Sequence, residues 1–279
     1  MAQRIDGRKI ASQIKNELAE EMTRLKAENF RVCLAVIQVG EDPASSVYVN
    51  NKKKACALIG IESLSFELRQ EASERELLSL ITFLNTEPKV TGILVQLPLP
   101  AHINERNIFE AINPDKDVDG FHPLNIGRLW TGEKGFLPCT PAGILQLLKR
   151  SRISLDGKNC VIIGRSNIVG KPLAALLLQE NATVSIAHSR TKNLPALAKQ
   201  ADILIVAVGQ KEMITSEYVK KGAVVIDVGI HRDENNKLCG DVDFADVESI
   251  ASAITPVPGG VGPMTIAMLM DNCVSISRN

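Results

Sequence analysis

The sequence predicts an α/β protein built from two α/β domains, and two features of the chain support this fold class. Along most of the 279 residues, short runs of β-branched residues alternate with amphipathic segments of helical periodicity. This order is typical of parallel sheets covered by helices. Residues 160–179 (CVIIGRSNIVGKPLAALLLQ) have the strand–turn–helix order of a nucleotide-binding unit. We therefore expect the second domain to be a Rossmann-like, doubly wound parallel sheet.

Each expected element follows from its local pattern. In the first half, hydrophobic spacing predicts helices near 4–28, 44–59, 73–84 and 104–108, and strands at 32–39, 64–68 and 92–97. Ser73 and Glu76 have the spacing of a capping box at the start of the helix 73–84. The second half predicts strands near 160–163, 183–187, 203–208 and 223–228, with helices between them. A last helix, 263–276, carries an apolar stripe that needs a partner surface: Ile266, Leu269, Met270, Cys273 and Ile276.

Composition and charge exclude several classes of protein. The chain has 32 basic and 32 acidic residues and no basic block, which argues against nucleic acid as a partner. No apolar run approaches the roughly 20 residues that span a bilayer, and the N-terminus does not read as a signal peptide. The six cysteines form no C-x-x-C pair, and the four histidines lie in separate segments. We expect reduced thiols, a cytoplasmic location and no bound metal.

A glycine turn in the second half predicts nucleotide binding. Gly164 ends a strand, and Gly170 opens a helix, so that the backbone can approach a phosphate. The next strand ends in residues 188–192 (HSRTK), where an NAD-specific fold would carry an acid. Because Arg190 stands there instead, with Arg165 in the turn, we favour NADP over NAD. The alternatives are an ordinary strand-to-helix turn and loop cations that only face solvent.

Polar residues in the first half form candidate chemical sites. Tyr48 and Lys52 share one helix face, and that stripe is otherwise apolar; the alternative is a solvated lysine run. Gln96 closes an apolar strand at the end where α/β sheets bind ligands, or it bonds only its own loop. Residues 114–121 (PDKDVDGF) mimic a calcium loop but lack its last acidic ligand and its flanking helices. One aspartate of this segment is a candidate for recognising the donor edge of a polar ring; the alternative is a solvated acidic loop.

Read in order, these segments resemble a known family. SSVYVNNKKK, ILVQLPLP, KDVDGF, GRSNIVGKP, AHSRT, IDVGI and TPVPGGVGPMT resemble the bifunctional methylenetetrahydrofolate dehydrogenase/methenyltetrahydrofolate cyclohydrolases. The resemblance implies oxidation of 5,10-methylenetetrahydrofolate to the methenyl form with NADP, then hydrolysis to 10-formyltetrahydrofolate. It places the protein in one-carbon metabolism and purine biosynthesis and implies a homodimer. The alternatives are an NADP-dependent dehydrogenase of another small substrate and a non-catalytic nucleotide-binding sensor.

The segment near 120–140 is rich in glycine, proline and aspartate and weakly periodic, which predicts a linker at 123–138. We therefore expect a folate-binding catalytic domain at 1–122 with 263–279 and an NADP-binding domain at 139–262. The resemblance assigns roles to residues and the place of the last helix. The C-terminal helix returns to the first domain. The implied catalytic residues are Lys52, Tyr48, Gln96 and Asp119. The implied substrate contacts are Tyr48, Lys52, Gln96, Leu97, Asp119, Pro258, Gly259 and Gly260. The implied cofactor contacts are Gly164, Arg165, Ser166, Ser189, Arg190 and Ile230.

Overall fold

The computed structural model describes residues 2–40 and 43–278, and the side chains of 43–48 lie outside this description. The chain forms two compact units, one made of Met1–Ala11 and Thr140–Thr265 and the other of Ser12–Cys139 and Ile266–Asn279. Within the described residues, no helix combines the length and apolar character needed to cross a membrane.

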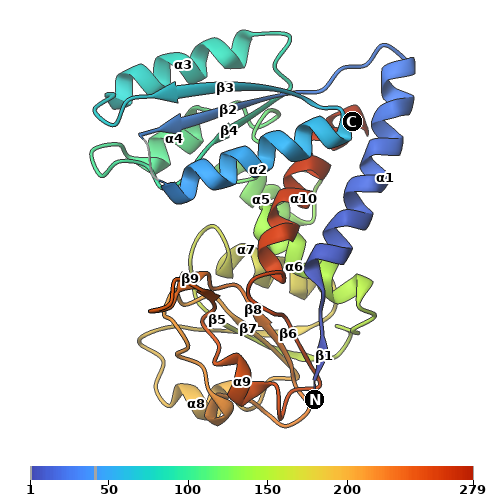
Figure 1. Cartoon of the computed structure of the whole chain (residues 1–279), viewed down its shortest axis with the longest axis vertical. Helices are drawn as coiled ribbons and strands as arrows, with labels where there is room; N and C mark the ends of the chain where they lie inside the picture. Colours follow the sequence, from blue (N-terminus) through green and yellow to red (C-terminus); the bar gives the residue numbers. More distant parts are fainter. Residues whose placement is uncertain (1, 41–42, 279) are drawn as a thin grey trace. The chain divides into compact units, whose positions relative to one another are not determined.

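The unit formed by Ser12–Cys139 and Ile266–Asn279 contains a parallel sheet of order β3-β2-β4 (Figure 1). Its strands are β2 (Cys33–Val39), β3 (Glu62–Leu68) and β4 (Gly92–Val95). The helices are α1 (Gly7–Ala27), which begins in the other unit, α2 (Pro43–Ile59), α3 (Glu74–Thr86), α4 (Glu105–Ala111), α5 (Pro123–Thr131) and most of α10 (Val261–Ser275), followed by a 3-10 turn at Ile276–Arg278.

The central strand β2 sorts its side chains between the two faces of this sheet. All of its residues are buried, and alternate ones, Ala35, Ile37 and Val39, pack in one cluster with residues of α3 and α4. Because side chains alternate along a strand, the intervening residues face the opposite side, where α2 lies (Figure 1). Helix α3 begins with the expected capping box between Ser73 and Glu76.

The unit formed by Met1–Ala11 and Thr140–Thr265 contains a six-stranded parallel sheet of order β1-β11-β8-β7-β5-β6. Its strands are β1 (Gln3–Arg4), β5 (Asn159–Ile163), β6 (Thr183–Ala187), β7 (Ile203–Val206), β8 (Val224–Asp227) and β11 (Ala253–Ile254). The helices are α6 (Cys139–Arg150), α7 (Gly170–Gln179), α8 (Leu194–Ala198) and α9 (Phe244–Val247), with a 3-10 turn at Ser216–Tyr218. A small antiparallel hairpin pairs β9 (His231–Arg232) with β10 (Leu238–Cys239).

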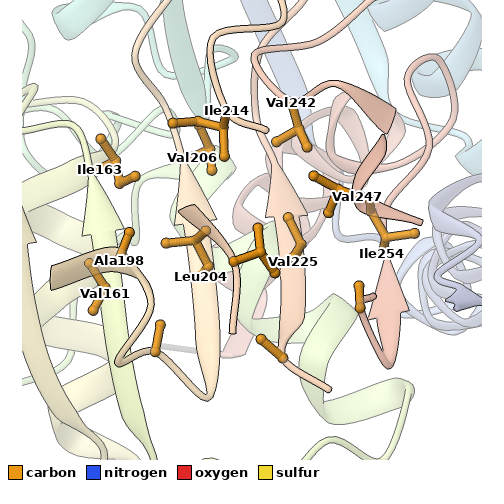
Figure 2. Packing of buried hydrophobic residues seen from close by; sticks show 14 of the residues in the cluster. Val161, Ile163, Ala198, Leu204, Val206, Ile214, Val225, Val242, Val247 and Ile254 are labelled. Carbon is orange, nitrogen blue, oxygen red and sulfur yellow. The ribbon is translucent and has the colours of Figure 1, made fainter. Parts of the chain in front are cut away.

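One face of the six-stranded sheet carries a continuous apolar core. Figure 2 shows Val161 and Ile163 of β5 beside Leu204 and Val206 of β7, with Val225 of β8 next along the sheet. Burying a side chain of this size contributes about 1.5–3 kcal/mol. This core fixes the strand ends, so the loops that follow β5, β7 and β8 start from defined positions.

The structure differs from the sequence-based expectation in the segment 123–138. This segment was expected to be a linker, but it contains the helix α5. The proline and glycine that suggested a linker are the signals that start and stop the helix. Pro123 follows the N-cap His122, whose Nδ1 accepts a hydrogen bond from the Leu124 amide at 3.0 Å. Gly132 ends the helix in the left-handed conformation, with φ +77°.

The N-terminal segment also lies elsewhere than expected. The first eleven residues were expected in the first domain, but they join the six-stranded sheet because β1 pairs in parallel with β11. Their pairing partner is about 250 residues away along the chain, so no local pattern indicates it.

The C-terminal helix returns to the unit that contains the three-stranded sheet, as the resemblance implied. Leu269, Met270 and Cys273 of α10 are buried, and the Met270 sulfur lies 3.6 Å from the Cys56 sulfur of α2. Ile266 and Ile276, at the two ends of the expected stripe, are only half-buried.

Candidate functional site

A buried lysine, Lys52, pairs with the half-buried Gln96 on the α2 face of the three-stranded sheet. Lys52 is only 8% exposed, although its neighbour Lys54 is exposed. Its ammonium donates a hydrogen bond to Gln96 Oε1 at 2.9 Å. Gln96 directly follows β4, and its Nε2 donates to the Leu97 carbonyl. Since an ammonium carries three N–H groups, this contact orients Lys52 and uses only one of its donors.

The structure separates the three aspartates of segment 114–121 by their surroundings. Asp115 is exposed and lies 3.6 Å from the Arg128 guanidinium. Asp117 is buried, and its Oδ2 accepts hydrogen bonds from the His122 amide at 2.8 Å and from Asn125 Nδ2 at 3.0 Å. These contacts hold the start of α5, which is a structural task. Asp119 is half-buried and is the carboxylate that senses the charge of Lys52.

Opposing effects act on the carboxyl group of Asp119. Burial raises its pKa above the ordinary value, while the positive charge of Lys52 and a hydrogen bond from the Cys139 thiol lower it. Burial likewise raises the pKa of Cys139 well above the ordinary value, and the Asp119 charge adds to that rise. Cys139 therefore stays a neutral thiol, and its Sγ donates a hydrogen bond to the Val118 carbonyl at 3.5 Å. A hydrogen bond links Lys52 to Gln96, and the charge of Lys52 acts on Asp119, so these residues are electrostatically coupled within one unit.

Sequence reasoning missed two residues that shape this group, Cys139 and Asn272. Asn272 is buried in α10, and its Nδ2 donates to the Val118 carbonyl at 2.8 Å and to the Leu137 carbonyl at 2.9 Å. Val118 directly precedes Asp119, and Leu137 directly precedes Pro138 and Cys139, so both hydrogen bonds hold backbone next to the site. Asn272 could have been found from the sequence, because an asparagine within an apolar helical stripe indicates a buried polar contact. Cys139 could not, because a single cysteine after a proline indicates no particular role.

Other expected substrate contacts are placed less directly. The side chain of Tyr48 lies outside the described part of the chain. Leu97 is half-buried and accepts the Gln96 hydrogen bond through its carbonyl. Pro258, Gly259 and Gly260 belong to the unit with the six-stranded sheet, and the Gly259 carbonyl accepts a hydrogen bond from the Arg8 amide at 3.1 Å.

The glycine turn after β5 is tightly built. Gly164 adopts φ +135°, and a Cβ added there would lie 2.3 Å from the Ala207 carbonyl oxygen. A Cβ added at Gly170 would lie 2.1 Å from the Gly164 carbonyl oxygen. Only glycine fits either position. Ser166 Oγ accepts hydrogen bonds from the Val169 and Gly170 amides at 3.1 and 3.4 Å, which fixes the entry into α7.

The predicted cofactor residues gather at the carboxyl ends of neighbouring strands. The Gly164 amide donates to the Ala187 carbonyl at the end of β6, so Ser189 and Arg190 follow directly beside the glycine turn. Arg165, Ser166, Ser189 and Arg190 are all exposed. Ile230 follows β8 and is 46% exposed, so its side chain is accessible to a ligand. The binding of a phosphate-bearing dinucleotide is favoured by three features: the glycine turn after β5, the arginine after β6 and the exposed isoleucine after β8.

Fold and sites define a class of protein: a two-unit α/β enzyme with a Rossmann-like nucleotide-binding unit and a second unit that carries a buried lysine. The family model for the tetrahydrofolate dehydrogenase/cyclohydrolase catalytic domain matches residues 5–119, and the model for the NAD(P)-binding domain matches residues 138–279. The chain belongs to the tetrahydrofolate dehydrogenase/cyclohydrolase family.

Individual relatives agree with this membership over the full length. The bifunctional protein FolD of Agathobacter rectalis is 65% identical and covers 100% of both chains. The crystal structure of the Campylobacter jejuni enzyme FolD, a methylenetetrahydrofolate dehydrogenase/cyclohydrolase, is 52% identical with TM-score 0.98 and covers 100% of this chain and 99% of its own. The crystal structure of the Trypanosoma brucei enzyme, solved with NADP cofactor and an inhibitor, is 37% identical with TM-score 0.94. The match covers 99% of this chain and 97% of that one.

Proposed function

We propose that this protein oxidises 5,10-methylenetetrahydrofolate to the methenyl form with NADP⁺ and hydrolyses the methenyl form to 10-formyltetrahydrofolate. The hydrogen bond between the buried Lys52 and Gln96, together with the effect of the Lys52 charge on Asp119, is the observation that supports this proposal most. It joins a proton-carrying group, an orienting amide and an acceptor for ring N–H groups within one unit. That unit is the proposed folate-binding domain, and the unit with the six-stranded sheet is the proposed NADP-binding domain.

Substrate orientation in this proposal rests on Asp119. Its carboxylate accepts hydrogen bonds from the N–H donors of the folate ring. Burial raises the pKa of Asp119, and the charge of Lys52 and the Cys139 thiol act against that rise. Leu97, Tyr48 and the segment Pro258–Gly260 complete the proposed set of substrate contacts.

The hydrolytic step is the one that requires proton transfer. Water adds to the methenyl carbon and loses one proton, which leaves a neutral hydroxyl adduct. As the bond to the leaving ring nitrogen breaks, that nitrogen gains a proton and the hydroxyl loses its own to become the formyl carbonyl, so that one proton is released overall. Lys52, held at 2.9 Å by Gln96, is the proposed group that exchanges these protons. A positioned acid or base contributes about 10²–10⁴-fold to a rate.

NADP⁺, when bound, supplies the hydride acceptor. Gly164, Arg165 and Ser166 of the glycine turn, Ser189 and Arg190 after β6, and Ile230 are the proposed residues that hold it. Arg190 and Arg165 supply charge-assisted hydrogen bonds for a 2′-phosphate.

A two-stage assay tests the function. Purified protein is mixed with 5,10-methylenetetrahydrofolate and NADP⁺, and the methenyl absorbance is followed as it rises and then decays. Reduction of NADP⁺ without decay would contradict the cyclohydrolase activity. No reduction with this substrate, but reduction with another small alcohol or hydroxy acid, would favour the alternative dehydrogenase.

Lys52→Gln separates the two activities. Glutamine keeps a hydrogen-bond donor but exchanges no proton at neutral pH, so cyclohydrolase activity should fall by about 10²–10⁴-fold. Dehydrogenase activity should survive in measurable part, and methenyltetrahydrofolate should accumulate in stopped-flow absorbance. Lys54→Gln, an exposed neighbour on α2, is the matched control. A parallel loss of both activities in Lys52→Gln would assign Lys52 a positioning role only.

The proposal extends to assembly and setting. The protein is proposed to act as a homodimer in the cytoplasm, to supply one-carbon units for purine biosynthesis, and to bind neither nucleic acid nor membranes. All six cysteines are free thiols, which suits a reducing compartment. Light scattering after size-exclusion chromatography measures the molar mass in solution, and a molar mass equal to that of one chain would exclude the dimer.

A further inference from the structure

Asp241 is a fully buried carboxylate that hydrogen-bonds the loop after β7. Its Oδ2 accepts from the Val208 amide at 2.7 Å and from the Gly209 amide at 3.1 Å. Its Oδ1 accepts from the Gln210 amide at 2.9 Å and from His231 Nε2 at 2.7 Å. These donors offset the desolvation of the carboxylate. Three consecutive amides thus depend on one side chain for their geometry.

A second buried carboxylate, Asp227 at the end of β8, holds Asp241 in place. Its oxygens accept hydrogen bonds from the amides of Gly229, Asp241 and Val242 at 2.9–3.0 Å. Its own amide donates to Thr255 Oγ1 at 2.8 Å, directly after β11. Burial raises the pKa of Asp227 to about 6, against the effect of its three backbone donors. The ends of β7, β8 and β11 are therefore tied together through Asp227 and Asp241.

The apolar core anchors the segment that carries Asp241. Val242 forms a parallel bridge with Ile214, and the Ile214 amide donates to the Asp241 carbonyl at 3.0 Å. Figure 2 shows Ile214 beside Val206 at the arrowhead end of β7, and Val242 at the arrowhead end of the neighbouring strand β8, within the same apolar cluster. The position of Asp241 is therefore fixed by contacts with the core as well as by its contacts with the loop.

The loop that Asp241 holds borders the proposed dinucleotide site. Its first residue, Ala207, donates its amide to the Ile163 carbonyl at 2.8 Å and lies against Gly164 of the glycine turn. His231, the other partner of Asp241, follows Ile230 in the chain. In open α/β sheets ligands bind beyond the carboxyl ends of the strands, which is where this loop and Ile230 lie.

We propose that Asp241, supported by Asp227, is a positioning residue for dinucleotide binding, which presets the loop 208–210 and the Ile230–His231 segment. This inference rests on the proposed NADP⁺ binding. A loop that is already ordered loses less conformational freedom when a ligand binds, so affinity is higher than for a loop that the ligand must order.

Asp241→Asn tests the proposal, because an amide keeps the shape but directs donor hydrogens at groups that are themselves donors. The amide group keeps one acceptor oxygen, so hydrogen exchange followed by NMR should show at least ~10-fold faster exchange for the backbone amides that face the new NH2 group, either Val208 and Gly209 or Gln210. NADP⁺ titration should show a Kd raised ~10-fold or more. Cyclohydrolase kcat with methenyltetrahydrofolate should stay within about twofold, because Lys52 lies in the other unit. Asp243→Asn, which caps α9 in the same segment, is the matched control and should change none of these.

A pair of variants at His231 gives a second test that does not depend on the folding of Asp241→Asn. His231→Leu removes the donor to Asp241 and should raise the NADP⁺ Kd, while His231→Gln keeps a donor and should restore binding. Failure of the unmodified protein to bind NADP⁺ would refute the proposed function itself. Normal NADP⁺ binding by Asp241→Asn or by His231→Leu would overturn the inference, and so would equal losses of NADP⁺ binding and cyclohydrolase activity.

Discussion

Replacing Asn272 by leucine should destabilise the unit that contains the three-stranded sheet and weaken folate binding. The amide of Asn272 joins α10 to two chain segments, through the Val118 carbonyl at 2.8 Å and the Leu137 carbonyl at 2.9 Å. Leucine fills a similar space but donates no hydrogen bond. The two carbonyls would then lack this partner; the Val118 carbonyl would keep only the longer contact to the Cys139 thiol at 3.5 Å, and the partly buried Leu137 carbonyl would be only partly compensated by water.

The size of the effect follows from these two contacts. A buried polar group that loses its partner costs about 1–3 kcal/mol, and the Val118 contact is fully buried while the Leu137 contact is only partly so. We expect the free energy of unfolding to fall by about 2–4 kcal/mol in total. Because Asp119 follows Val118 directly, folate affinity should fall by roughly tenfold, a factor that corresponds to about 1.4 kcal/mol. NADP⁺ affinity should remain unchanged.

Urea denaturation and isothermal titration with each ligand measure these quantities. Asp271→Asn is the matched control, since Asp271 is the adjacent residue of α10 and its ion pair with Arg278 is exposed. Exposed pairs of this kind contribute about 0–1 kcal/mol. If Asn272→Leu is as stable as Asp271→Asn and binds folate normally, the two hydrogen bonds of Asn272 to backbone carbonyls are not what positions Asp119.

Three further variants test separate parts of the site. Asp119→Ala should weaken folate binding while leaving the NADP⁺ Kd within about twofold in isothermal titration, and a comparable loss for NADP⁺ would give Asp119 a structural role. Arg190→Ala should narrow the ratio of kcat/KM for NADP⁺ over NAD⁺ by about tenfold, whereas the exposed Lys199→Ala should leave it unchanged. A wild-type ratio of one or below would refute the NADP preference. Burial raises the pKa of Asp117 from 3.8 to about 7, so its contribution to stability is complete below about pH 4 and is lost as the pH rises through about 7. Urea denaturation at several pH values measures this loss of stability, and Asp117→Asn should make the free energy of unfolding fall less steeply between about pH 4 and pH 7. The same pH dependence in the variant and the unmodified protein would contradict the role of Asp117.

The sequence by itself determined the features that depend on local patterns. Hydrophobic period places Lys52 on an apolar stripe of α2, and the structure finds it buried there. The capping box at Ser73 and the glycine turn at Gly164 follow from the residues at those positions. Such signals lie within a few residues of one another, because they arise from the geometry of one turn or one helix face.

The tertiary structure decided what depends on distant partners. It gives the physical difference between Asp119, on which the charge of Lys52 acts, and Asp117, which holds the start of α5. It alone brings Asn272 to the Val118 carbonyl and Asp241 to the loop after β7, over separations of 154 and about 32 residues. These contacts form only when separate elements pack together, and a single polar residue facing a remote backbone group leaves no periodic trace in the sequence.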